Sequence, residues 1–226
     1  MHHKQTLEQA TGCSNHVRAM PDIEISLDDI CYHQRDDLKE SDMPTEEEYS
    51  KFLQDESTMI YFRNEPHSRG ILIHRHIVAS CSVLLGKSLC MHRKGSTGTR
   101  FIVKNCTAEI LDRFGDFLRY GNYEPFADLG SNLLGYTEMY VLAEKYKVDN
   151  LKQVSLSYLR KTLGHLKLTE ERFPKLVQVI HMIYEGTMAG DLARDTVALF
   201  ARCFKGHFPS KTYEELCKQL PDFYED

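Results

Sequence analysis

Several side chains that can bind a metal ion crowd into one window of the sequence: His74, His76, Cys81, Cys90, His92 and Cys106. Imidazole nitrogens and thiolates are the ligands that zinc prefers in proteins. Structural zinc sites normally use closely paired ligands such as Cys-x-x-Cys, and the spacings in this window match no common finger or knuckle. We therefore predict no metal site and interpret these side chains as ordinary packed or exposed residues.

The triplet Gly86-Lys87-Ser88 spells the end of a phosphate-binding loop. The complete motif, G-x-x-x-x-G-K-S, needs its first glycine at the position that Cys81 occupies. A strand should also precede such a loop, whereas Val83-Leu84-Leu85 is more typical of a helix. The sequence contains neither a Gly-x-Ser-x-Gly elbow nor paired carboxylates that would support catalysis. We therefore predict a non-enzyme without a catalytic residue or a cofactor.

The elements that must position these residues are short. Apolar runs at 59–62 and 71–73, joined by the polar segment 63–69, predict a β-hairpin. The apolar spacing then becomes helical, and Ser82 is a good N-cap before Val83. The predicted order is therefore strand, strand, short helix, cap and second short helix.

This order is accompanied by a resemblance to a known family. Residues 74–85, HRHIVASCSVLL, are similar to the core of the BTB/POZ domain, where a strand ending in His-Arg or His-Lys leads into a helix pair. Residues 101–103, 108–123 (AEILDRFGDFLRYGNY) and 142–148 (LAEKYKV) resemble the third strand and the next helices of that family. The resemblance implies an α+β fold over residues 57–163, with a small, mostly antiparallel sheet capped by helices.

Residues 1–56 are acidic, with 14 Asp or Glu residues against 5 Lys or Arg residues. Such an aromatic-poor segment is typical of a solvated tail, so we predict that it is largely disordered. It is not an arm for nucleic acid, because phosphate binding needs the opposite charge. Residues 23–27 alternate and leave open a short strand that pairs with a partner chain. Thr45 and Glu48 fit a capping box, which predicts a short helix at 45–54.

Helical patterns dominate the rest of the chain. The apolar face at 110–118 predicts a helix that Thr107 caps and Gly121 ends. Further helices are predicted at 133–146 and after a cap at Asp149, with an end near Gly164. Residues 164–226 carry three more helix starts, near Thr169, at Asp191, and at Ser210 or Thr212. This part resembles the helical extension of short fungal BTB proteins, and we expect it to pack on the preceding helix.

The resemblance also implies a surface for self-association, built from the hairpin and the first two helices. The predicted partner-binding residues are Arg75, Ile77, Val78, Val83 and Leu84. Arg75 matches the basic residue of a charged pocket at the family's dimer interface, but Thr58 stands where its acidic partner is expected. The predicted function is a protein–protein interaction module that forms a homodimer or pairs with another BTB-like chain.

Two alternatives use the same fold. A substrate adaptor for a cullin-type ubiquitin ligase commonly carries a hydrophobic-x-Glu element where this chain reads LCMHRK at 89–94. A transcription-associated regulator would act without its own DNA-binding module, because the sequence has no zinc-finger pairs and no basic helix. The basic residues around the segment 91–100 are Lys87, Arg93, Lys94, Arg100 and Lys104. They are interpreted as part of a solvated loop, with an acidic partner as the alternative. No interleaved aromatic residues support contact with nucleic acid there.

Cysteine content and hydropathy indicate the compartment. Seven cysteines, an odd number at irregular spacing, argue for reduced thiols and against a disulfide framework. No apolar run approaches the roughly 18 residues that a membrane helix needs, and residues 1–20 lack the apolar core of a secretory signal. We therefore expect an intracellular location, cytoplasmic or nuclear, and no membrane contact.

Overall fold

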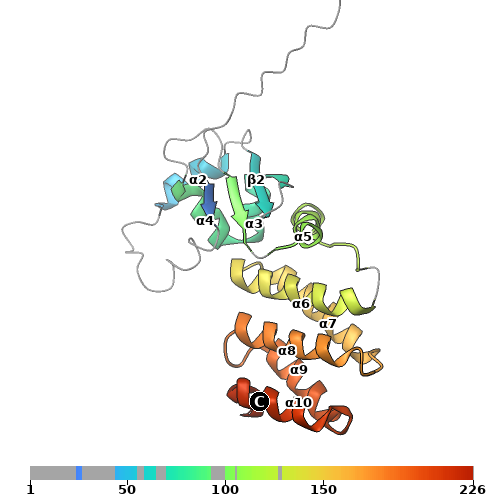
Figure 1. Cartoon of the computed structure of the whole chain (residues 1–226). Helices are drawn as coiled ribbons and strands as arrows, with labels where there is room; N and C mark the ends of the chain where they lie inside the picture. The colour runs from blue at the N-terminus through green and yellow to red at the C-terminus, as the bar shows by residue number, and fades with distance from the viewer. Residues whose placement is uncertain are drawn as a thin grey trace, which may run out of the picture.

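The computed structural model describes residues 24–26, 44–54, 59–64, 70–92, 100–104, 106–126 and 129–225. Within this part of the chain the fold is α+β, as predicted. A small sheet with helices around it is followed by layers of helices that extend away from the sheet toward the C-terminus (Figure 1).

Four strands form one sheet in the order β1-β4-β2-β3, with the bounds Glu24–Ser26 (β1), Met59–Asn64 (β2), Gly70–His74 (β3) and Arg100–Val103 (β4). β2 and β3 form the predicted hairpin, in which Phe62 pairs with Ile71. β4 runs parallel to β2, and β1 runs parallel to β4. The expectation of a mostly antiparallel sheet is therefore wrong. The sheet is mixed because the chain returns from β3 through two helices, which brings β4 alongside β2 in the same direction.

β1 falls within the alternating segment at 23–27 that left open a strand paired with a partner chain. In the structure it pairs with β4 of its own chain, and Ile25 lies opposite Phe101. The prediction of a largely disordered tail covers residues 1–56. Apart from β1 and residues 44–54, these residues lie outside the part of the chain that the structure describes.

The predicted helix before the hairpin is confirmed as α2, Glu46–Gln54. Its capping box is formed, since the Thr45 N–H donates to Glu48 Oε2 at 2.9 Å and the Glu48 N–H donates to Thr45 Oγ1 at 3.2 Å. Phe52 is the buried residue of this helix, and it faces the helices that follow the hairpin. α2 therefore covers part of the region that the sequence left open for a partner.

The helix pair consists of α3, Arg75–Cys81, and α4, Val83–His92. Ser82 between them is the predicted cap, because its Oγ accepts the Leu85 N–H at 3.1 Å. The same hydroxyl donates to the Tyr146 carbonyl at 2.7 Å, which fixes the pair to a later helix. At Gly86 a Cβ would lie 2.8 Å from the Cβ and 3.0 Å from the Cα of Ala79, so the close approach of α3 to α4 favours glycine at this position.

One part of the hydrophobic core lies between the sheet and α5, Ala108–Tyr120, and the core continues through the later helices. Phe62 contacts Phe114 edge to face at 6.1 Å between ring centroids, and the whole predicted apolar face of α5 is buried. Thr107 caps α5 as predicted by accepting the Ile110 N–H, and Gly121 ends it in the left-handed conformation at φ 71°.

β3 is an outer strand of the sheet. The Arg119 side chain reaches it from α5, and its Nη2 donates to the Leu72 carbonyl at 2.9 Å. One backbone acceptor of the outer strand is thus occupied by a side chain of the same molecule.

The remaining helices form stacked layers (Figure 1): α6 Leu129–Tyr146, α7 Asp149–Gly164, α8 Phe173–Gly186, α9 Leu192–Cys203, a 3-10 turn Lys205–His207, α10 Ser210–Gln219 and α11 Pro221–Glu225. α6 packs against both α7 and α8, and α7 also contacts α9, so the extension packs on the preceding helices as predicted. Asp149 is the first residue of α7 and caps nothing with its side chain, so that prediction is wrong. Asp191 does cap α9, since it accepts the Ala193 N–H at 2.8 Å.

A partly buried ionic cluster joins α6, α7 and α9. Lys152 Nζ lies 2.6 Å from Glu144 Oε2 and 2.7 Å from Asp191 Oδ2. The Tyr140 hydroxyl donates to Asp191 Oδ1 at 2.6 Å, and Lys147 pairs with Glu144. Because each helix contributes at least one charged group, the cluster fixes the relative positions of the three helices.

Arg194 links the last helices in a similar way. This buried side chain donates to the Tyr184 carbonyl at 2.8 Å, to both oxygens of Thr187, and to Asp222 Oδ2 at 3.1 Å. α8, α9 and α11 therefore meet on one guanidinium group.

Candidate functional site

The structure divides the predicted partner-binding residues into buried and accessible ones. Arg75 and Val78 are only 1% and 0% exposed, so neither side chain is available to a partner. The guanidinium of Arg75 lies 4.6 Å over the ring centroid of Phe52, and Val78 belongs to the hydrophobic core. Their assignment to the contact surface is therefore wrong, because α2 and the core cover the sides of α3 on which they lie.

The other three predicted residues are accessible to different degrees. Ile77 and Leu84 are half-buried, and Ile77 packs against the core. Val83 is 61% exposed at the first turn of α4. Val83, Lys87 and Met91 follow one another at helical spacing of four residues, and all three are at least partly accessible. We call these three residues the outer line of α4.

The charged pocket that the family resemblance implied is not assembled from described residues. Arg75 is buried, and Thr58, at the position of its expected acidic partner, lies outside the part that the structure describes. Of the basic residues around the segment 91–100, the structure describes the side chains of Lys87 and Lys104, both half-buried. The proposed acidic partner for that segment stays a prediction.

The candidate zinc ligands do not converge where the structure describes them. No group of three His, Cys, Asp or Glu side chains among the described residues could hold a metal ion. His74 and His76 are neighbours, with ring centroids 5.5 Å apart. Burial, followed by the nearby Glu138 carboxylate, raises the pKa of the Cys106 thiol to about 12. A thiol that stays protonated near neutral pH is a poor metal ligand and a poor nucleophile.

The Gly86-Lys87-Ser88 triplet lies inside α4 and not in a loop. Its backbone N–H groups therefore belong to a helix interior, where they cannot surround a phosphate in the way of a phosphate-binding loop. Gly86 has a packing reason, because Tyr49 and Ala79 both approach it closely.

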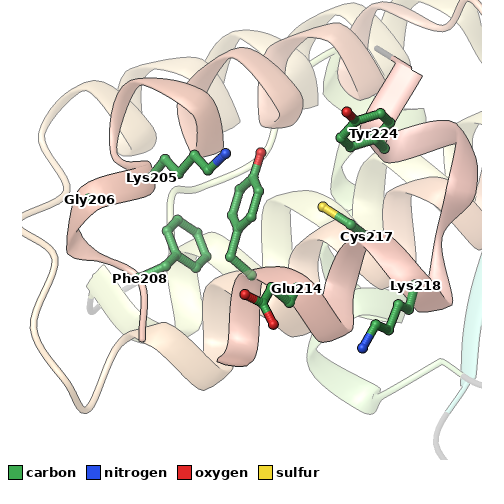
Figure 2. A pocket seen from close by; sticks show the side chains of 8 residues that line it. Lys205, Gly206, Phe208, Glu214, Cys217, Lys218 and Tyr224 are labelled. Carbon is green, nitrogen blue, oxygen red and sulfur yellow. The ribbon is translucent and has the colours of Figure 1, made fainter. Parts of the chain in front are cut away.

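A feature that sequence reasoning missed is an open hollow of about 760 Å³ among the last helices (Figure 2). Its lining consists of Lys205, Gly206, Phe208, Tyr213, Glu214, Cys217, Lys218 and Tyr224. Two lysines and one glutamate are among these residues, so the formal charge of the lining is positive. Lys205 Nζ also lies 4.9 Å from the Tyr213 ring centroid, which gives that ring a cation of its own chain. The lining residues are spread over two helices and a turn, and no motif marks them.

A second missed feature is a smaller hollow of about 430 Å³ beside the end of α5. The run YGNYEP at 120–125 contributes most of its lining, and the rest comes from one turn upstream in α5 and from α7. Two tyrosines and one glutamate within six residues are a sequence signal, but the hollow forms only where Tyr158 of α7 meets this run.

Within the described residues, none of the helices combines the length and the apolar composition needed to cross a membrane. In comparisons with known proteins, no protein-family model matches the chain, and no curated protein matches it either.

Proposed function

We propose that this chain is a protein–protein interaction module and not an enzyme, with a BTB/POZ-like domain over residues 57–163 and a helical extension over residues 164–226. The order of the elements supports the proposal. A hairpin, a pair of short helices, a third strand and a series of helices follow one another as the resemblance led us to expect. A scaffold of this kind does not by itself determine function, which depends on the residues of its surface.

The observation that carries the proposal is the outer line of α4. Lys87 is the only Lys, Arg, Asp or Glu residue of this helix, so its accessible side is mostly apolar. Burying a side chain such as Val83 against a partner contributes about 1.5–3 kcal/mol before the cost of association is subtracted. We infer that the partner is a second copy of this chain, or another BTB-like chain with a matching apolar surface.

The test is the solution mass of the full chain, measured by light scattering over a range of concentrations. The wild type is expected to show a dimer, and Val83→Asp is expected to shift the equilibrium toward the monomer. Leu199→Asp is the matched control, because Leu199 is 62% exposed and belongs to α9, a helix that lies far from α4 (Figure 1). Val78→Asp is unsuitable, since a charge at this buried position would unfold the domain.

A wild type that stays monomeric at every concentration would refute self-association, and pairing with another chain would then need to be found by co-purification. A dimer that persists equally in Val83→Asp and Leu199→Asp would refute the α4 surface.

We also propose an intracellular location, in the cytoplasm or the nucleus. The cysteines of the described part, Cys81, Cys90, Cys106, Cys203 and Cys217, are free thiols, which supports a reducing compartment. Imaging of a fluorescent fusion tests the location.

A further inference from the structure

The smaller hollow lies where the end of α5, the segment after it and α7 meet. Its lining residues are Asp116, Tyr120, Asn122, Tyr123, Glu124, Pro125 and Tyr158. A volume of about 430 Å³ is within the range of small-ligand sites and is sufficient for one long side chain. We call it the tyrosine hollow.

The tyrosine hollow is built on a well-fixed base. Gly121 reverses the chain in the left-handed conformation, and the Asn122 side chain then holds the segment in place. Asn122 Oδ1 accepts the Tyr123 N–H at 2.9 Å and the Tyr158 hydroxyl at 3.3 Å. The hydroxyl oxygen of Tyr123 lies 3.1 Å from Ser155 Oγ in α7. These contacts hold rings from two distant parts of the chain beside one another before any ligand binds.

The rings differ in orientation and exposure. Tyr123 and Tyr158 meet edge to face, with centroids 5.5 Å apart and an angle of 69° between the rings. Tyr158 is supported from behind by Tyr136, which stacks on it at 5.0 Å. Tyr120 is 77% exposed at the rim. Because the faces of aromatic rings carry negative potential, such an arrangement attracts a cation.

The charged side chains that line the tyrosine hollow are both acidic. Asp116 and Glu124 line the hollow, whereas no Lys or Arg residue does. The Glu124 carboxylate has no ion-pair partner among the residues that the structure describes. Asp116 Oδ1 has one distant partner, Arg119 Nη1 at 3.7 Å, and Arg119 also donates to the Leu72 carbonyl. Among the described residues, Glu124 is therefore unpaired and Asp116 is only weakly paired.

The other nearby arginine is engaged elsewhere. Arg113 Nε donates to the Glu124 carbonyl at 3.1 Å, its Nη1 lies 3.1 Å from Glu109, and its guanidinium lies 4.1 Å over the Phe126 ring. Arg113 thus fixes the backbone of Glu124 and leaves the carboxylate for a ligand.

We propose that the tyrosine hollow binds a lysine or arginine side chain of a basic segment of a partner protein. The side chain enters between Tyr120 and Tyr158, with its charge directed at Glu124 and Asp116. This surface lies on α5 and α7, so the inference does not rest on association through α4. The larger hollow near the C-terminus is not a competing site for a cation, because two lysines line it.

The experiment uses the full chain and two fluorescent peptides, one alternating arginine with glycine and one alternating lysine with glycine. Binding is followed by fluorescence anisotropy, and the neutral counterparts carry citrulline or acetyl-lysine. We expect the charged peptides to bind and the neutral ones to fail. Tyr120→Ala and Glu124→Gln are each expected to weaken binding about threefold, and the double variant roughly tenfold.

Matched controls separate this site from general attraction to an acidic protein. Tyr224→Ala removes a second tyrosine that is also 77% exposed, and Glu170→Gln removes an exposed carboxylate between α7 and α8. Both controls are expected to bind like the wild type. The proposal is overturned if neither charged peptide binds, if the neutral peptides bind equally well, or if the controls weaken binding as much as Tyr120→Ala and Glu124→Gln.

Discussion

Replacing Lys152 by methionine should destabilise the chain strongly, because the amine joins two carboxylates from two other helices. Its side chain is 25% exposed, while those of Glu144 and Asp191 are 13% and 7% exposed. Methionine keeps the aliphatic stem but leaves two partly buried negative charges beside each other. From the cost of removing one partner of a buried pair, reduced for the remaining solvent access, we expect a loss of about 3 kcal/mol. For a chain of this size the loss corresponds to a drop in Tm of roughly 6–12 °C.

The pH dependence of this loss identifies its cause. Partial burial by itself would raise the pKa of Glu144 and of Asp191. Hydrogen bonds outweigh it, chiefly those from Lys147 and Lys152 to Glu144 and from Lys152 and Tyr140 to Asp191, so both pKa values lie below their usual range. A carboxyl group with a lowered folded-state pKa stabilises the protein above its unfolded pKa of about 4. This contribution is lost as the pH falls through the folded-state pKa, so the gap between wild type and Lys152→Met should narrow on acidification.

The assay is thermal unfolding followed by circular dichroism, at neutral pH and at a series of acidic pH values. Lys51→Met is the matched control, because Lys51 forms an exposed pair with Glu47 at 2.6 Å and such pairs contribute little. If Lys152→Met has the same Tm as the wild type, the two partly buried carboxylates do not need the Lys152 amine for stability, and the prediction is refuted. A gap that stays constant at every pH would show that lost packing, and not charge, causes the destabilisation.

Three further outcomes follow from single contacts. Arg194→Leu should lower the free energy of unfolding by about 2–4 kcal/mol, because it leaves buried carbonyl groups without their donor; denaturant titration measures this. Gly86→Ala should cost about 1–3 kcal/mol by the same measurement, since the new Cβ would collide with the Cβ and Cα of Ala79, and an unchanged midpoint would contradict the close packing of α3 on α4. In a timed alkylation at mildly alkaline pH, followed by mass spectrometry, exposed Cys203 should react well before Cys106, whose pKa of about 12 keeps its thiol protonated.

Most helix caps could be predicted from the sequence. Thr45, Ser82, Thr107 and Asp191 all cap helices as expected, because a cap depends on residues within one turn of the chain. The prediction that Asp149 caps a helix failed because an acidic residue is favourable both at the cap and in the first turn, and Asp149 lies in the first turn of α7.

The contact surface was harder to predict because α3 is so short. Its seven residues include Ile77 and Val78, adjacent apolar positions of which only one is fully buried. A pattern of two turns does not determine which side faces the core. One side of α3 is covered by α2, a helix that precedes the hairpin in the sequence. The Phe52 ring of α2 contacts the Arg75 guanidinium there.

The tyrosine hollow illustrates a second limit. Tyr120 and Tyr123 are near neighbours in the sequence, but Tyr158 joins them only because Gly121 turns the chain back toward α7. Distances between such residues depend on how α5 and α7 pack, which no local pattern encodes.

The contact between Arg119 and the Leu72 carbonyl has a consequence for unwanted polymerisation. An outer strand with unsatisfied backbone groups is a template on which strands of other molecules can add. In β3 the acceptor at the middle residue is already taken by a guanidinium that also carries positive charge to the rim of the sheet. A foreign strand that pairs at this residue would have to displace the guanidinium, so the contact hinders strand addition at this position of the edge.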